Sequence, residues 1–234
     1  MAEIRILSAG AAQAVVERIA AEWHLESGNE VKGEFSAVGA IRQRVLDGAA
    51  VDVIILTGAL IEELVASGQV AAGTRADLGK VGTGVAVRAG TPLPDVSSAQ
   101  AVRGLLLAAG AVVCPDPATA TAGKVVMQLL ERLAVSGEVN PRMRHFPNGY
   151  AAMQWLAGSR GQNEVGITQI TEILANPGVT YAGPLPGELQ AKTVYSAGVA
   201  AKAAAPGPAR DFIARLTSGT ARAVLAKAGY EFDN

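Results

Sequence analysis

The stretch Ile4-Arg5-Ile6-Leu7-Ser8-Ala9-Gly10-Ala11 sets the pattern that decides the fold. Its first four residues form a short apolar strand, and the small residues after them form a turn from which a helix can begin. Residues 11–27 then carry apolar side chains at three- and four-residue spacing, which predicts an amphipathic helix. We expect that helix to end at Gly28-Asn29, because glycine readily adopts the left-handed conformation of a helix C-terminus.

The same order of strand, small-residue turn and helix recurs along the chain. A strand over residues 30–36 leads through residues 37–39 into a second helix, and a strand over residues 51–56 leads through Thr57-Gly58 into a third. Such repeats predict an α/β fold in which helices cover the faces of a mostly parallel sheet. Further strands of this kind are expected at residues 111–114, 143–146 and 164–168.

Two longer strand patterns interrupt this alternation, near residues 82–88 and 193–199. We interpret them as two crossover strands that join two lobes and act as a hinge. The sequence therefore predicts a two-lobed α/β protein, in which residues 1–83 and 196–234 form the first lobe and residues 84–195 form the second.

Composition and charge exclude several classes of protein. Half of the 234 residues are hydrophobic and 18% are charged, so the chain can bury a substantial core. The 20 basic and 21 acidic residues give a formal net charge of -1, so the chain has no excess of basic residues of the kind that nucleic-acid-binding proteins carry. No apolar run in the sequence approaches the roughly 20 residues that a membrane-spanning helix needs.

The sequence also predicts no metal site and no cofactor. Cys114 is the single cysteine and cannot form an intramolecular disulfide, and one cysteine with two histidines cannot build a zinc cluster. The glycines match neither the dinucleotide fingerprint nor the phosphate-binding loop. We expect Cys114 to be a small buried hydrophobic residue.

Four turns carry the candidate site, because ligands of parallel α/β sheets bind beyond the carboxyl ends of the strands. The turns are residues 8–11, 36–39, 116–123 and 147–150, and each precedes a predicted helix. Backbone N–H groups at a helix start carry partial positive charge, and small residues let an anion approach them. Any one of these turns could be an ordinary cap, but four in a fixed order favour a small-anion site built mainly from neutral donors.

The order of motifs resembles the periplasmic molybdate-binding protein family. The resemblance is carried by Ile4 to Ala11, Phe35 to Gly39, Val51 to Ile55, Asp116 to Gly123 and Val165-Gly166-Ile167. It implies the type II periplasmic binding protein fold, a cleft that closes on an anion, and delivery to the permease of an ABC transporter. It further implies a monomer in the periplasm. Since residues 1–5 do not look like a secretory signal, the chain is either cytoplasmic or numbered without its signal peptide.

Three side-chain donors of that family are replaced in this sequence. The family uses hydroxyl groups on the first two turns and a tyrosine after the late Gly-Ile strand, where this chain has Ala11, Gly39 and Gln169. Backbone donors at Ala122 and near Gly149 do not depend on side-chain identity. Residues 82–90 and 165–174, with parts of the segment 183–198, are similar to a divergent branch that includes bacterial aconitate isomerase. That branch implies an organic carboxylate, such as a di- or tricarboxylate, as an alternative to an oxyanion.

These arguments give one list of candidate binding residues. Arg42 is the cation expected to pair with the anion, and Tyr150 is the aromatic residue expected to reach the cleft. The predicted ligand-binding residues are Ser8, Gly10, Ala11, Ser36, Val38, Gly39, Arg42, Thr57, Thr119, Thr121, Ala122, Gly123, Asn148, Gly149, Tyr150 and Gln169.

Two other classes remain open from the sequence. An enzyme similar to aconitate isomerase would need a group that takes and returns a proton at carbon. Asp116 could serve, but an aspartate before Pro117 is also a natural turn former, and we assign no catalytic residue. A cytoplasmic sensor of a small anion is the third class.

Overall fold

The computed structural model describes residues 1–233, which divide into two compact units. The first unit comprises Met1–Val81 together with the chain from Thr193 onward, and the second comprises Gly82–Lys192. The chain passes between the units twice, once within strand β4 (Ala76–Arg88) and once at the beginning of strand β9 (Lys192–Val199). Each unit is described by itself below.

The sheet of the first unit has the order β2-β1-β3-β9. Strand β1 (Glu3–Ala9) is parallel to both neighbours, β2 (Glu30–Ser36) and β3 (Val53–Thr57). Strand β9 then runs antiparallel to β3. A short strand, β10 (Tyr230–Glu231), pairs antiparallel with β4 at Lys80 and Val81.

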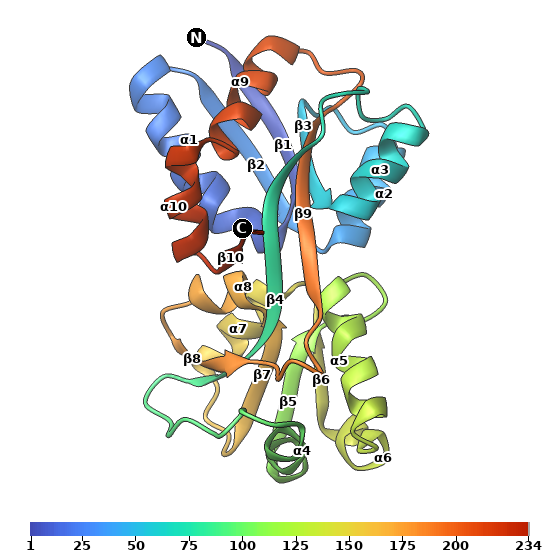
Figure 1. Cartoon of the computed structure of the whole chain (residues 1–234), viewed down its shortest axis with the longest axis vertical. Helices are drawn as coiled ribbons and strands as arrows, with labels where there is room; N and C mark the ends of the chain where they lie inside the picture. The colour runs from blue at the N-terminus through green and yellow to red at the C-terminus, as the bar shows by residue number, and fades with distance from the viewer. Residues whose placement is uncertain (234) are drawn as a thin grey trace. The chain divides into compact units, whose positions relative to one another are not determined.

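Helices cover both faces of this sheet. Figure 1 shows α1, α9 and α10 on one side and α2 and α3 on the other. Trp23 of α1 is fully buried, its ring centroid lies 5.2 Å from that of Phe212, and its indole N–H donates to Asp211 Oδ2 at 2.8 Å. The helices are α1 (Gln13–Ser27), preceded by a 3₁₀ turn at Gly10–Ala12, α2 (Val38–Leu46), α3 (Gly58–Ala66), α9 (Pro206–Leu216) and α10 (Gly219–Lys227).

The sheet of the second unit has the order β4-β7-β5-β6, and β8 pairs with β4. Strands β5 (Ala111–Pro115), β6 (Met143–Phe146) and β7 (Glu164–Gln169) are mutually parallel where they pair. Strand β4 runs antiparallel to β7 and to β8 (Val179–Pro184). The sequence pattern did not predict β8, whose last two residues are glycine and proline.

Two apolar cores lie on opposite faces of this second sheet. One core contains Val85 and Ile167 and packs against α4 and α5, and the other contains Ala86 and packs against α7. Since successive side chains of a strand point to opposite faces, Thr83 and Gln169 belong to the α5 face and Thr168 to the α7 face. The helices are α4 (Ala99–Ala108), α5 (Thr121–Arg132), α6 (Ser136–Val139), a 3₁₀ turn at Asn140–Arg142, α7 (Gly149–Gly158) and α8 (Ile170–Leu174).

The buried role expected for Cys114 is confirmed, and the structure also shows the roles of Asp52 and Ser98. Cys114 is fully buried in the α5-side core, and burial raises the pKa of its thiol to about 12. Asp52 is buried and accepts backbone N–H groups from Arg5 and Ala205, so it supports the beginning of α9. The cap of α4 is Ser98 rather than Ser97, because the Ser98 hydroxyl accepts the N–H of Ala101.

Candidate anion site

Side-chain caps divide the helix starts into two groups. Helices α3, α4, α7 and α10 each begin at a Thr, Ser or Asn whose side-chain oxygen accepts a backbone N–H of the first turn. Helices α1, with its preceding 3₁₀ turn, α2 and α5 begin after alanine residues that make no such bond. The first N–H groups of these three helices are therefore left for another acceptor, such as an anion. Helix α9 and the short helices α6 and α8 also lack a side-chain cap, and α9 begins with Pro206, which has no N–H to offer.

In the first unit, two of the four predicted turns, together with the turn at Thr57-Gly58, follow the carboxyl ends of neighbouring strands. The register places Ala9 beside Ser36, and β3 pairs in parallel with the other side of β1. Ser8 is fully buried and its hydroxyl donates to the carbonyl of Ala9 at 3.0 Å, while Thr57 Oγ1 accepts the N–H that caps α3. The predicted residues gathered along this edge are Ser8, Gly10, Ala11, Ser36, Val38, Gly39 and Thr57.

Arg42, the predicted anion-binding cation, is engaged in an ion pair. Its guanidinium donates to Glu63 of α3, with the Nε bond at 3.1 Å, because α2 and α3 lie on the same side of the sheet. Its neighbour Arg44 is likewise paired, with Glu34. Arg42 is therefore not a free cation in this structure, and it would have to leave Glu63 to reach a ligand.

In the second unit, the turn at residues 116–123 follows β5 and leads into the uncapped start of α5. Asp116 Oδ1 accepts the N–H of Ala118 at 2.8 Å, so this aspartate serves as the turn former that its place before proline predicted. Ala122 is buried, and a Cβ at Gly123 would overlap the Pro115 carbonyl. Glycine is therefore needed for α5 to begin this close to the strand. The other predicted residues here, Thr119 and Thr121, are half-buried.

Gln169 ends β7 on the same face of the sheet as α5. Its side chain is 2% exposed, and in the described chain neither its amide nitrogen nor its amide oxygen has a hydrogen-bond partner. Thr83 lies directly opposite it in the β4–β7 register, is fully buried, and also has an unpartnered hydroxyl. Unpaired buried polar atoms are rare and cost roughly 1–3 kcal/mol each. Gln169 and Thr83 therefore form a buried polar cluster whose donors and acceptors have no hydrogen-bond partners within the described chain.

The turn at residues 147–150 differs from the other three, because its donors are already used within the protein. Asn148 Oδ1 accepts the N–H of Ala151 at 2.8 Å, so Asn148 is the cap of α7. The carboxyl group of Glu172 lies against Gly149, and the backbone N–H groups of Gly149 and Tyr150 favour its charged form. The carboxyl group of Glu172 therefore lies at the beginning of α7, where the sequence predicted donors for the ligand.

Glu172 is a candidate functional residue that sequence analysis missed. Its side chain is 6% exposed, and its Oε2 accepts a hydrogen bond from the Thr168 hydroxyl at 2.6 Å. Burial raises its pKa from 4.5 to about 7, although hydrogen bonds from Thr168 and from the backbone of Gly149, Gln169 and Tyr150 favour the charged form. The available signal was an acid within the apolar segment Ile170–Leu174.

The raised pKa gives a testable dependence of stability on pH. Because the folded state holds this proton more tightly than the unfolded state, Glu172 favours folding fully below pH 4.5, and that contribution is lost as pH rises through about 7. Relative to Glu172→Gln, the wild type should lose about 3 kcal/mol of unfolding free energy between pH 4.5 and pH 8. Urea unfolding of both proteins at the two pH values measures this difference, and equal differences at both would contradict it.

Comparison with known sequences identifies the protein family to which this chain belongs. The model of the bacterial extracellular solute-binding protein family matches residues 4–231, so the chain belongs to that family. The sequence is 29% identical over 234 residues to the aconitate isomerase of a Pseudomonas species, a match that covers 97% of this chain and 86% of that protein.

Solved structures show the same fold. The periplasmic molybdate-binding protein of Azotobacter vinelandii is similar with a TM-score of 0.83 and 20% identity, over 99% of this chain and all of that one. The sulfate-binding protein of Mycobacterium tuberculosis H37Rv gives a TM-score of 0.73 and 20% identity, over 98% and 86% of the two chains. The α/β periplasmic binding protein fold that the sequence predicted is therefore confirmed, as is the family resemblance. No helix within residues 1–233 has the length and apolar character needed to cross a membrane.

Proposed function

We propose that this solute-binding protein captures a small oxyanion or an organic carboxylate in the periplasm and delivers it to the permease of an ABC transporter. The observation that carries the ligand class is the buried amide of Gln169, which lacks a partner beside the uncapped start of α5. Backbone N–H groups, an amide and a hydroxyl are all donors suited to anionic oxygen atoms. The pairing of Arg42 with Glu63 supports a site built mainly from neutral donors.

An organic carboxylate fits the second unit better than a bare tetrahedral oxyanion. The Gln169 amide offers both a donor and an acceptor, and Thr83 adds a hydroxyl on the same face. A carboxylate ligand that also carries a hydroxyl or a protonated carboxyl group could satisfy both kinds of atom, whereas molybdate and sulfate carry no donor for the amide oxygen. The 29% identity with an aconitate isomerase supports a di- or tricarboxylate as well.

Thermal denaturation in the presence of candidate ligands tests the ligand class. A ligand that binds the native state raises the apparent melting temperature. Molybdate, tungstate, sulfate, citrate, cis-aconitate, trans-aconitate and small dicarboxylates form the panel. We expect the carboxylates to give the larger shifts, and a response confined to molybdate and tungstate would contradict that preference.

Substituting Gln169 separates binding from folding. In Gln169→Leu, an apolar side chain replaces the unpaired amide, so the ligand-free protein should be as stable as the wild type or more stable by about 1 kcal/mol. Affinity for the carboxylate identified by the thermal screen should fall tenfold or more, because a donor to a charged group is lost. Calorimetric titration and urea unfolding measure the two effects.

The matched control is Gln190→Leu, in the same unit. The Gln190 amide accepts the N–H of Thr83 at 2.8 Å and donates to the carbonyls of Thr83 and Leu185. Its loss should therefore destabilise the ligand-free protein, unlike the loss of Gln169. If Gln169→Leu destabilised the protein equally and left the affinity unchanged, the assignment of Gln169 to the ligand site would be wrong.

A second candidate function is an isomerase acting on aconitate or a related tricarboxylate. It is favoured by the match to aconitate isomerase and by Glu172, whose pKa of about 7 is suited to proton transfer near neutral pH. Incubation with cis-aconitate followed by chromatography decides between the candidates. Conversion to the trans isomer identifies an enzyme, and stoichiometric binding without turnover identifies a carrier.

A further inference from the structure

The beginning of α7 already holds an internal anion, the carboxylate of Glu172. The Glu172 side chain is almost fully buried, and Thr168 donates to its Oε2 at 2.6 Å. A Cβ on Gly149 would overlap both Glu172 Oε2 and Thr168 Oγ1, so the helix start is in direct contact with this carboxylate. Helix α7 is ten residues long, and its first N–H groups provide the positive potential that stabilises the charge.

The residues around Glu172 are among those that were predicted to hold the ligand. Gly149 lies directly against this carboxylate, the backbone N–H groups of Gly149, Tyr150 and Gln169 favour its charged form, and all three residues belong to the predicted site. A ligand anion at this helix start would therefore compete with Glu172 for donors. Two negative charges at the same poorly solvated helix start also repel each other strongly. Both conflicts disappear when Glu172 is neutral.

Among the described residues, the three elements that pack most closely against α8 carry no cation that would offset this repulsion. Helix α8 packs against α7, β7 and β8. The titratable groups on those three elements are Tyr150 on α7, Glu164 at the far end of β7 and Tyr181 on β8, and none of these described residues is basic. Burial accordingly raises the pKa of Glu172 to about 7, so the proton can be gained or lost near neutral pH.

We propose that Glu172 couples anion binding to proton uptake, so that the protein binds its anion together with one proton, taken from solvent onto this carboxylate. The inference rests on the proposed function, because it requires an anion at the helix starts of the second unit. In this scheme a protonated Glu172 releases the N–H groups of Gly149 and Tyr150 to the ligand. Loss of the proton restores the internal hydrogen bonds and expels the anion.

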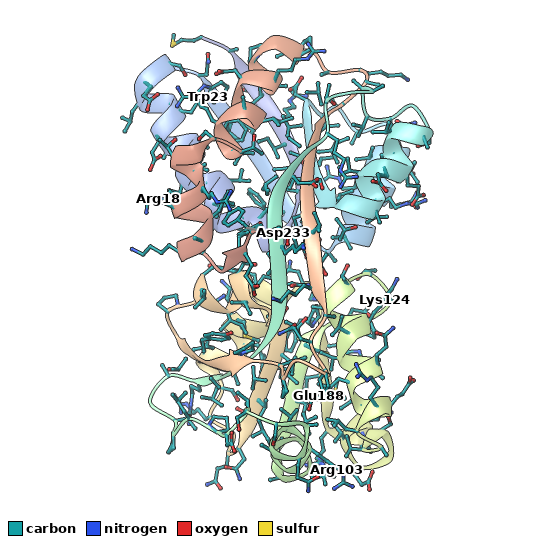
Figure 2. The ribbon with its side chains drawn as sticks, viewed as in Figure 1. Arg18, Trp23, Arg103, Lys124, Glu188 and Asp233 are labelled. Atoms are coloured by element: carbon teal, nitrogen blue, oxygen red, sulfur yellow. The ribbon has the colours of Figure 1, made fainter. Side chains whose placement is uncertain are left out.

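The coupling predicts how affinity depends on pH. If binding of one anion takes up one proton, the affinity should fall by up to tenfold for each pH unit above the pKa of the free protein. Glu172→Gln, which keeps the shape but carries no charge, should bind tightly with little dependence on pH. Glu188→Gln is the control, because Glu188 is an exposed acid of the same unit, labelled in Figure 2.

Calorimetric titration with trans-aconitate and with molybdate, between about pH 6 and pH 8.5, tests the coupling. Ionisation of the ligand itself affects all variants alike and cancels in the comparison. Heats measured in two buffers of different ionisation enthalpy give the number of protons bound, which should be close to one for wild type and Glu188→Gln at pH 8 and close to zero for Glu172→Gln. Equal pH slopes and equal proton uptake in wild type and Glu172→Gln would overturn the proposal.

A measurement without ligand keeps the inference distinct from the proposed function. If neither probe binds, the proposed function fails for these ligands, while an NMR titration of the free protein still tests Glu172. The amide signals of Gly149 and Tyr150 should shift with a single midpoint shared with the Glu172 carboxyl signal, and amides that do not respond between pH 6 and pH 8 would overturn the inference. Thr168→Val, which removes a donor to the charged form, should move that midpoint to higher pH; it also serves if Glu172→Gln does not fold.

Discussion

Gly149→Ala is expected to destabilise the protein by about 3 kcal/mol, at the upper end of the usual range for overpacking substitutions. The added methyl group would overlap Glu172 Oε2 and Thr168 Oγ1 at once. These two oxygen atoms are hydrogen-bonded to each other and buried, so neither can move without breaking that bond. The substitution therefore forces α7 away from α8 or leaves a buried carboxylate without its partners.

Gly158→Ala is the matched control, because Gly158 is the last residue of the same helix and a Cβ there meets no atom within 4 Å. Urea unfolding should show a change of less than about 1 kcal/mol for this variant. Similar losses for both variants would mean that helix packing at Gly149 is looser than the structure indicates.

Trp23→Ala is expected to cost about 4 kcal/mol of unfolding free energy, within the usual range for removing a buried tryptophan. The Trp23 side chain is fully buried between α1 and α9, where it contacts Phe212 and donates to Asp211. Its removal leaves a large cavity and deletes the hydrogen bond to Asp211, whose exposed carboxylate stays solvated beside Arg215. Because α1 and α9 are distant in sequence, the loss should also weaken the attachment of the C-terminal helices to the first sheet.

Leu25→Ala is the corresponding control on α1, since Leu25 is 85% exposed. Its effect on unfolding should stay within about 0.5 kcal/mol. Thermal unfolding followed by circular dichroism measures both variants, and a small effect of Trp23→Ala would show that α9 contributes little to the stability of the unit.

Periodicity was sufficient to predict much of the fold. The strand predicted over residues 30–36 coincides with β2, and the strand predicted over residues 143–146 coincides with β6. Strand β8 was missed because Gly183 and Pro184 are typical of turns, and its pairing with β4 depends on a contact that is distant in sequence. Helix starts were placed within one or two residues, since capping serines and small turns mark them locally.

The candidate site was predictable where it depends on the backbone alone. Turns after parallel strands place N–H groups at the sheet edge whatever the side chains are, which is why the beginnings of α2 and α5 could be proposed as donor sites. The partners of side chains depend on which helices meet. Nothing in the sequence indicates that Arg42 pairs with Glu63 or that Glu172 reaches the beginning of α7, because both contacts join separate helices.

The alternation of β7 at Thr168 and Gln169 has a practical consequence for protein engineering. Thr168 contacts the carboxyl group of Glu172, and the next residue, Gln169, belongs to the buried polar cluster on the opposite face. Selectivity among ligands and the working pH range could therefore be adjusted at two consecutive codons with little interference between them. Such a chain would make a suitable scaffold for a family of biosensors, each with its own analyte and its own operating pH.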